Sequence, residues 1–310
     1  MQTVRTAYSA SERIWGDGME NIRTAVALGL FDGVHLGHRA VLRAAAEQKK
    51  QGLIPCAFTF PPESASKKGG AGYIYGECEK NSILREACGT ERILSPKFED
   101  ICGMDGESFA RDILCGEMNA AFVCCGYDFR FGSGAACGVD KLREYGKKYG
   151  FSVMAVEDIC CCGQRVSSTL IRELVSDGDM EKAELFLGAP YLIFKEVSRG
   201  AQLGRTIGFP TANQLFGRGQ LVPRFGVYAS ETVTGGKKYP SITDIGVKPT
   251  VNYGGAPLAE TYIHGFSGDL YGSPLQVRLK RFIRPEMKFG SVEELKKQIG
   301  ADIKSAINIL

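Results

Sequence analysis

The sequence predicts two domains of different fold class: a doubly wound parallel α/β sheet over residues 1–183, and a small antiparallel β-barrel with a terminal helix over residues 184–310. With 310 residues, 44% of them hydrophobic, the chain is long and apolar enough for two ordinary domains. Apolar runs alternate with helical patterns in the first half, whereas the second half is rich in glycine and short β-like runs. Strand–helix alternation is typical of a parallel sheet, and short strands with frequent turns are typical of a small barrel.

Four apolar runs are expected to form the parallel sheet. They cover residues 24–31, 54–60, 121–125 and 151–156. A helical pattern over 38–50 follows the first run, and Gly52 is a typical stop for such a helix. A helix in this place connects two parallel strands by a right-handed crossover. The segment 61–76, rich in Pro, Gly, Ser and Lys, is expected to be a mobile loop. Because ligands of such sheets bind beyond the carboxyl ends of the strands, the residues that follow each run are the candidates for a site.

The second half shows a different pattern. Short β-like runs occur at residues 226–229, 240–245, 260–263 and 275–279. The tail from Ser291 has the apolar spacing of an amphipathic helix, with Ser291 and Glu294 in the positions of a capping box. A helical stretch over 168–187 precedes this region, so we place the domain boundary near residue 184.

Composition and charge exclude several classes of protein. The formal net charge of +3 is too small for a dedicated nucleic-acid binder, in which a basic stripe is expected. No apolar run is long enough to span a membrane, and the polar N-terminus lacks the apolar core of a signal peptide. The 11 cysteines lack the paired spacing of a zinc site, and we interpret them as free thiols. The expected location is the cytoplasm.

The strongest motif covers residues 29–38 (GLFDGVHLGH), where a predicted strand passes into a helix. His35 and His38 are three residues apart there and can face one ligand together. The helix N-terminus adds unpaired N–H groups and a positive dipole end. Gly29 and Gly37 allow the backbone to approach a phosphate closely. The motif therefore predicts a site that stabilises charge on a transferring phosphorus.

This stretch resembles the HxGH nucleotidylyltransferases, which bind a nucleoside triphosphate and transfer its nucleotidyl group directly. The resemblance assigns His35 and His38 to the triphosphate as catalytic residues. Residues 167–172 (SSTLIR) are similar to the family's second signature. Hydroxyls at a helix start with an arginine one turn later form a natural anion clamp. The resemblance implies a nucleotide site made from Gly29, Phe31, Asp32, Gly37, Ser168, Thr169 and Arg172.

The segment 126–132 (GYDFRFG) indicates which substrate is used, because it is similar to a motif of bacterial FAD synthetases. Its charged pair, Asp128 and Arg130, suits either ligand binding or a structural role at a strand end. The sequence departs from the family after Phe60, where Glu63 replaces a usual histidine. A carboxylate near phosphates repels them unless Mg²⁺ or a basic group lies between.

A second constellation covers residues 200–213 (GAQLGRTIGFPTAN). Its glycines supply flexible backbone for phosphate contact. Thr211 and Asn213 point the same way if the chain is extended, and both offer the oxygen ligands that Mg²⁺ prefers. The alternative for this run is a glycine-rich barrel turn.

The run resembles the signature of riboflavin kinases, and further stretches similar to that family follow at 226–229, 245–250, 269–272 and 283–289. The resemblance implies a Mg²⁺ site at Thr211 and Asn213, and it places Glu260 as catalytic base. Deprotonating an alcohol that attacks ATP fits a carboxylate. Lys195 and Tyr262 depart from the usual glycine and histidine. The implied substrate-binding residues are Gly200, Gly204, Arg205, Gly208, Pro210 and Arg284.

The order of the two resemblances is that of the bifunctional bacterial riboflavin kinase/FAD synthetases. It implies that ATP phosphorylates riboflavin to FMN, and that AMP is then transferred from ATP to FMN to give FAD and pyrophosphate. One alternative is a riboflavin kinase with an inactive or differently specific nucleotidylyltransferase domain, which Glu63 favours. Another is a flavin-sensing or RNA-binding regulator with inactive sites. His35, His38 and Glu260 oppose it, because binding alone requires no base.

Overall fold

The fold is that of a computed structural model, which describes residues 22–66, 72–200, 203–247 and 255–309. The chain divides into two compact units. The first consists of Met1–Ser64 and Asn81–Ile159, and the second of Ala65–Lys80 and Cys160–Leu310. The segment 65–80 therefore belongs to the second unit, although it lies in the first half of the sequence.

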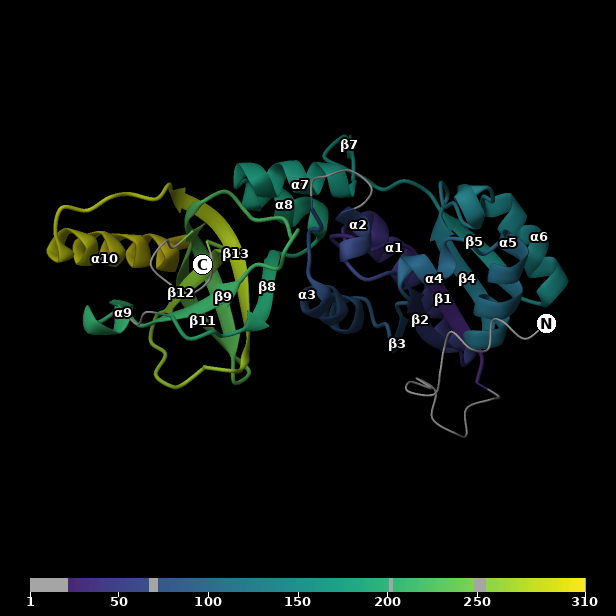
Figure 1. The fold of residues 1–310 in the computed structure, drawn as a ribbon, viewed down its shortest axis with the longest axis horizontal. Helices are drawn as coiled ribbons and strands as arrows, with labels where there is room; N and C mark the ends of the chain where they lie inside the picture. Colours follow the sequence, from purple (N-terminus) through teal and green to yellow (C-terminus); the bar gives the residue numbers. More distant parts are fainter. Residues whose placement is uncertain (1–21, 67–71, 201–202, 248–254, 310) are drawn as a thin grey trace. The chain divides into compact units, whose positions relative to one another are not determined.

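The first unit is built on a parallel sheet of five strands in the order β3-β2-β1-β4-β5 (Figure 1). The central strand β1 (Thr24–Leu28) pairs with β2 (Ile54–Phe58) and β4 (Ala120–Gly126). All five residues of β1 are buried, as expected for a strand covered on both faces. The outer strands are β3 (Arg92–Leu94) and β5 (Ser152–Val156). The predicted parallel α/β fold is confirmed, although the short β3 was not expected.

Helices connect these strands as crossovers. The first crossover is α1 (Leu36–Glu47), which is followed by a 3₁₀ turn, Gln48–Gln51, and by Gly52 with a φ of 79°. The second contains α2 (Glu63–Ser66), α3 (Glu77–Ser82) and a π-helical turn, Ile83–Ala87. The remaining helical segments are α4 (Phe98–Ile101), α5 (Gly106–Ser108), the π-helix Phe109–Glu117, the 3₁₀ turn Ser133–Ala135 and α6 (Val139–Tyr149).

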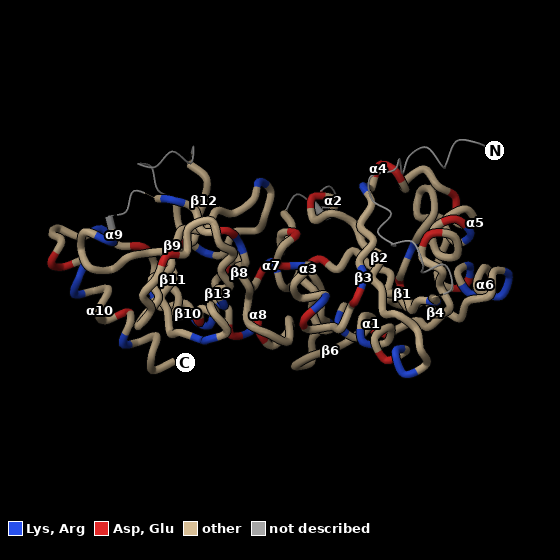
Figure 2. Tube along the Cα trace, turned by 90° about the horizontal axis from the view of Figure 1, so that it is seen from below, with Lys and Arg blue, Asp and Glu red and all other residues tan. Residues whose placement is uncertain are grey.

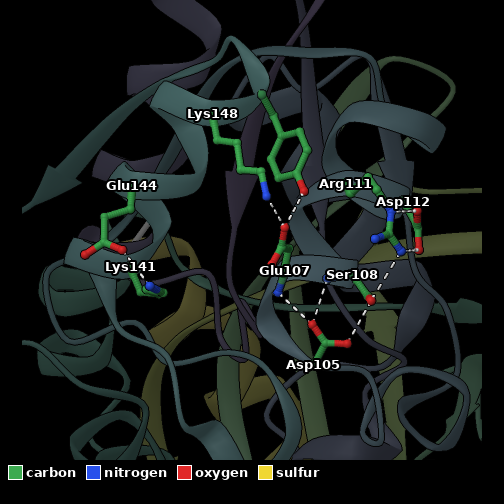
Figure 3. A network of polar contacts seen from close by, with 9 residues as sticks. Asp105, Glu107, Ser108, Arg111, Asp112, Lys141, Glu144 and Lys148 are labelled. Carbon is green, nitrogen blue, oxygen red and sulfur yellow. Dashed lines mark hydrogen bonds and ion pairs between the residues drawn. The ribbon is translucent and has the colours of Figure 1, made fainter.

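A polar network joins α5 to α6 on the surface of this unit (Figure 3). Asp105 caps α5 by accepting hydrogen bonds from the backbone N–H groups of Glu107 and Ser108, at 2.9 and 3.0 Å. Glu107 then pairs with Lys148 and accepts a 2.8 Å hydrogen bond from the Tyr149 hydroxyl. The hydrogen bond from Lys148 is the main reason why the pKa of Glu107 is lowered. The network fastens the two helices to each other.

The second unit is built on an antiparallel sheet of six strands in the order β8-β13-β10-β11-β12-β9. Its edge strands approach each other at one end, because the backbone N–H of Ser198 donates a 2.8 Å hydrogen bond to the Asn213 carbonyl. The predicted class, a small curled barrel, is confirmed. The strands are β8 (Tyr191–Glu196), β9 (Thr211–Leu215), β10 (Gly226–Thr234), β11 (Lys237–Val247), β12 (Pro257–Ile263) and β13 (Pro274–Arg284).

The terminal helix α10 (Val292–Ile309) covers this sheet through Ile303 and Ala306. Its predicted cap is present, since the Ser291 hydroxyl accepts a 3.1 Å hydrogen bond from Glu294 N–H. The unit also contains α7 (Ser168–Asp177), α8 (Met180–Leu187), α9 (Leu203–Thr206) and the hairpin of β6 (Cys160–Cys161) with β7 (Gln164–Arg165).

Part of the expected loop 61–76 is well packed instead. Ile74 and Tyr75 are 0% and 2% exposed, and the Tyr191 hydroxyl of β8 donates a 3.0 Å hydrogen bond to the Ile74 carbonyl. The backbone of Tyr73 bonds to Gly219 and Leu221. Burial of these large side chains explains why the segment belongs to the second unit. The expectation of a mobile loop over 61–76 is therefore wrong for Glu63–Ser66, which form α2, and for residues 73–75, which are irregular but packed; residues 67–71 lie outside the described part of the chain.

The distribution of thiols and charges agrees with the interpretation of the composition. All 11 cysteines are free, and burial raises the pKa of the Cys56 thiol to about 12. Lys and Arg are interspersed with Asp and Glu along the described parts of both units (Figure 2). Among the described helices, none has the length and hydrophobicity needed to cross a membrane.

Candidate active sites

The loop between β1 and α1 in the first unit has a strained backbone. Gly29 N–H donates to the Phe58 carbonyl of β2, and the Thr59 hydroxyl donates to the Leu30 carbonyl at 2.9 Å. Phe31 and Val34 have φ angles of 50° and 40°. A positive φ is especially unfavourable for a β-branched residue, so Val34 stores strain next to His35. Such strain is typical of loops that hold a functional group in place.

His35 is the N-cap of α1, and its Nδ1 accepts a 3.3 Å hydrogen bond from His38 N–H. The neutral ring therefore carries its proton on Nε2. The side chain is 6% exposed, and burial lowers the pKa of His35 to about 4. His35 is thus neutral at pH 7 and can donate a hydrogen bond from Nε2 without carrying charge.

His38 lies directly against His35. The two rings stack with centroids 3.7 Å apart, and the Phe31 ring meets His38 edge-on at 5.5 Å. Both histidines are therefore held in one place, as the spacing in the motif predicted. The nearby Asp32 is buried, at 6% exposed.

The glycines of this motif have a packing role in addition to the predicted one. A Cβ at Gly29 would lie 2.7 Å from Phe31 Cε1, and a Cβ at Gly37 would lie 3.3 Å from the His35 ring. Close approach of the backbone to a phosphate remains a prediction for both residues. The structure gives an independent reason for glycine, which is room for the aromatic rings that position the site.

The shifted pKa of His35 leads to a prediction about pH and stability. The unfolded chain protonates this histidine near pH 6.5, whereas the folded chain does so near pH 4, so lowering the pH across this window favours unfolding. We expect the loss to approach about 3 kcal/mol once the pH falls below the folded-state pKa. Hydrogen exchange of β1 and β4 amides should therefore accelerate more steeply from pH 7 to pH 5 in the wild type than in His35→Asn, after correction for intrinsic rates.

His264→Asn is the matched control for that experiment, because His264 is exposed and lies in the second unit. It should leave the pH dependence of β1 and β4 unchanged. Identical pH profiles for the wild type and His35→Asn would show that His35 does not titrate as stated.

Asp128 and Arg130 follow β4, and both line a cavity of about 490 Å³ in the first unit. Both side chains are exposed. Their position beside open space supports the ligand-binding interpretation, which remains a prediction. Glu63, the departure from the family pattern, is the first residue of α2 and is exposed.

The second predicted signature begins α7 in the second unit. Ser167 caps this helix by accepting a 3.2 Å hydrogen bond from Leu170 N–H, and Ser168 and Thr169 form its first turn. Arg172 Nε donates a 2.9 Å hydrogen bond to the Gly72 carbonyl. The hydroxyls and the guanidinium therefore come from one helix, while the two histidines belong to the first unit.

Part of the second constellation, Gly204, Arg205, Ile207 and residues 209–213, lines a cavity of about 660 Å³ within the second unit, whereas residues 201–202 lie outside the described part of the chain. Thr211 and Asn213 alternate along β9 and both border this cavity, as expected for an extended pair. Glu260 of β12 lies directly opposite Asn213 in the antiparallel register, so it points to the same side. A hydroxyl, an amide and a carboxylate thus converge on one space.

Asn213 has a buried side-chain oxygen that faces the predicted metal site. It is 6% exposed, and its Oδ1 has no hydrogen-bond partner among the described residues. A Cβ at Gly200 would collide with Asn213 Nδ2, so glycine at position 200 leaves room for this side chain. An orphaned buried oxygen beside Thr211 and Glu260 fits a divalent cation, because Mg²⁺ takes oxygen ligands.

The glycine-rich run forms the turn before β9. Gly204, Arg205 and Pro210 line the cavity, and Phe209 N–H donates a 2.8 Å hydrogen bond to the Gly204 carbonyl. A Cβ at Gly204 would collide with the Phe209 carbonyl, and Gly208 has a φ of 88°. This turn therefore requires glycine at both positions.

Arg284 lines the same cavity, but its guanidinium is engaged by α10. Its Nη2 donates to Asp302 Oδ2 at 2.7 Å and its Nε donates to Oδ1 at 3.2 Å, and Asp302 is only 2% exposed. Such a bidentate pair fixes the end of β13 to the helix. Substrate contact by Arg284 stays a prediction, and the ion pair gives this residue a structural role that the motif did not reveal.

The two residues of this half that depart from the family pattern, Lys195 and Tyr262, have different surroundings in the structure. Lys195 Nζ lies 3.3 Å from Glu79 Oε1, where Glu79 is 1% exposed, so this lysine neutralises a buried carboxylate. Tyr262 lines the cavity and packs edge-on against Phe209, with centroids 5.4 Å apart. Further aromatic residues border the cavity and suit a planar ligand; they are Phe266, Tyr271 and Phe289.

Sequence reasoning assigned only Glu260 among the acidic side chains that line this cavity, and it missed Asp244, Asp269, Glu286 and Asp302. Asp244 of β11 lies opposite Glu260 in the register and lines the same cavity. Ile242 and Asp244 are two residues apart, so the sequence indicates that they share one face of β11. Which site that face borders depends on the strand that pairs with β11, and the sequence does not indicate this strand.

Comparisons with known proteins match a different family to each part of the chain. A family model described as FAD synthetase matches residues 18–170, and one described as riboflavin kinase matches residues 187–310. The bifunctional riboflavin kinase/FMN adenylyltransferase of Escherichia coli is 37% identical over 284 residues, which cover 89% of this chain and 90% of that protein. The protein of the same description from Haemophilus influenzae is 34% identical and covers 99% of this chain and 98% of its own.

One further relative and one solved structure extend the comparison. The protein of the same description from Bacillus subtilis is 32% identical over 93% of both chains. A crystal structure from Streptococcus pneumoniae, described as a macrolide-efflux protein, has a TM-score of 0.75 and 29% identity, covering 93% of this chain and 95% of that one. The likeness to the solved structure extends over both units.

Proposed function

The chain belongs to the bifunctional riboflavin kinase/FMN adenylyltransferase family, and we propose that it phosphorylates riboflavin to FMN and then adenylylates FMN to FAD, with ATP as donor in both steps. The observation that carries this proposal is the convergence of Thr211, Asn213 and Glu260 on one cavity, together with the stacked pair His35 and His38 in the other unit. We assign the kinase to residues 184–310, the adenylyltransferase to residues 1–183, and the protein to the cytoplasm.

In the kinase step, Glu260 is the group that accepts the proton from the attacking primary hydroxyl of riboflavin. Its position opposite Asn213 supports this role. Thr211 and Asn213 would hold Mg²⁺, which neutralises charge on the ATP phosphates when bound. The aromatic side chains of the cavity suit the planar flavin ring.

In the adenylyl transfer step, His35 and His38 stabilise charge on the triphosphate of ATP. His35 does so as a neutral donor from Nε2, because its Nδ1 is occupied by His38 N–H. The N-terminus of α1 adds N–H groups and a positive dipole end at the same place. The phosphate of FMN attacks the α-phosphorus, and pyrophosphate leaves with charge that these donors stabilise.

A single assay tests the proposal. The protein is incubated with riboflavin, ATP and Mg²⁺, and riboflavin, FMN and FAD are separated by chromatography. We expect FMN and FAD to form and chelation of Mg²⁺ to stop both reactions. FMN that accumulates without FAD at every ATP concentration would remove the adenylyltransferase role, and replacing ATP by CTP with supplied FMN would then test the first unit for another nucleotide specificity.

Gly200 offers a test of the predicted metal-binding residue Asn213 that does not touch Asn213 itself. In Gly200→Ala, the new Cβ would collide with Asn213 Nδ2 and push the amide out of position. Because a displacement of about 1 Å can cost roughly 10²-fold in rate, we expect a kinase loss of that order with FAD formation from supplied FMN retained. Gly300→Ala on α10 is the control, since nothing lies near its Cβ, and it should keep full activity. An active Gly200→Ala kinase would show that the position of Asn213 is unimportant.

A further inference from the structure

Three neighbouring strands of the second unit place polar side chains in one row. Asp244 of β11 lies opposite Glu260 of β12, and Glu260 lies opposite Asn213 of β9. Directly opposed residues of antiparallel strands point to the same face. All three border the cavity of about 660 Å³, so Asp244 belongs to the kinase site, although no motif assigned it.

The row brings carboxylates of two adjacent strands to one face of the sheet. Like charges directly opposite each other on adjacent strands destabilise a sheet. A third carboxylate, that of Glu286, lines the same cavity and lies where a Cβ on Gly246, two residues beyond Asp244, would point. The substrate ATP is itself anionic, so it adds to this negative charge. Two cationic side chains, Arg205 and Arg284, also border the cavity, and the carboxylate oxygens together with the phosphates of ATP suit a divalent cation.

The buried amide at the end of the row points to the same conclusion independently. Asn213 is more than nine-tenths buried and keeps an Oδ1 without a hydrogen-bond partner among the described residues. An oxygen in that state usually has a ligand, a water or an ion as its partner. Carboxylate and amide oxygens are the ligands that Mg²⁺ and Mn²⁺ prefer.

We propose that Asp244 is a metal-ligating residue of the kinase site, which holds the divalent cation together with Asn213 and Thr211 and gives the site affinity for the cation before nucleotide binds. The two opposed carboxylates then have separate roles. Asp244 holds the cation, and Glu260 accepts the proton. The proposal rests on the proposed kinase function for its biological meaning, but the binding of the cation does not depend on turnover.

The test uses Mn²⁺ as the probe, with the full chain and without nucleotide. Electron paramagnetic resonance measures free Mn²⁺ during titration of the wild type, Asp244→Asn and Asp269→Asn. Asp269 is the matched control, because it is a carboxylate lining the same cavity and already accepts a 3.0 Å hydrogen bond from Tyr271 N–H. We expect Asp244→Asn to weaken one Mn²⁺ site by at least about tenfold, whereas Asp269→Asn should change it much less.

Kinetics and a conservative variant complete the test. Asp244→Asn should raise the Mg²⁺ concentration needed for half-maximal kinase rate, and saturating Mg²⁺ should restore most of kcat. Asp244→Glu keeps the carboxylate and should retain measurable Mn²⁺ binding, which separates loss of a ligand from misfolding. Unchanged Mn²⁺ affinity in Asp244→Asn would overturn the proposal, as would a loss of kcat that Mg²⁺ does not restore. A wild type that binds Mn²⁺ through Asp244 but makes no FMN would contradict the kinase function and leave the metal site standing.

Discussion

Glu260→Gln is expected to lower kinase turnover by about 10²–10⁴-fold, the usual contribution of a positioned general base. Phosphoryl transfer leaves little covalent work for the protein, so positioning and charge dominate its catalysis. Glutamine keeps the shape and hydrogen-bonding capacity of Glu260 but cannot take the proton. Riboflavin affinity should therefore stay nearly unchanged, because the lost interaction matters chiefly in the transition state.

The measurement is kcat for riboflavin phosphorylation beside the rate of FAD formation from supplied FMN. The second rate is the internal control, since that chemistry is assigned to the other unit. The competing interpretation is that Glu260 is a strand residue in a weak surface ion pair, for which glutamine would cost little. A kinase with nearly wild-type turnover would remove Glu260 from the mechanism.

His38→Ala is expected to abolish most FAD formation and to spare FMN formation. A preorganised donor of this kind contributes roughly 2.7–4 kcal/mol to the barrier, or about 10²–10³-fold in kcat. The cap of α1 should survive, because the hydrogen bond to His35 Nδ1 comes from the backbone N–H of residue 38. The loss therefore reports the imidazole and not the helix.

Two controls separate chemistry from folding in that experiment. His38→Gln keeps a side-chain hydrogen-bond donor and should retain more activity than His38→Ala. Circular dichroism should show no loss of helix in either variant. Equal losses of FMN and FAD formation would contradict the assignment, because they would indicate a folding defect or a site shared by both reactions.

Much of the fold could be predicted because its signals are local. The buried run at β1, the helical pattern that follows it and Gly52 as its stop lie within thirty residues of sequence, and each acts through its own backbone preferences. The cap of α10 by Ser291 is a local signal of the same kind. The packed segment around Ile74 was missed because its polar surroundings indicate a loop, and the partners that bury it, β8 and residues 219–221, are distant in sequence.

The candidate sites divide in the same way. The pair His35 and His38 could be predicted, because side chains three positions apart at the start of one helix lie on the same face. Thr211 and Asn213 could be predicted as one face of one strand. Arg284 could be placed at the cavity, but its bond to Asp302 could not, because that partner lies on a helix whose packing no local pattern specifies.

The sequence by itself determined the class of both domains, the strand-to-helix turn that carries the two histidines, and the identity of the glycine-rich run before β9. These features depend on neighbours in the chain, and backbone preferences and side-chain periodicity act at that range. Only the tertiary structure decided that Lys195 neutralises the buried Glu79 and that Asp244 lies in a row with Glu260 and Asn213. Strand register and burial bring those side chains together, and both arise from the packing of segments that are distant in sequence.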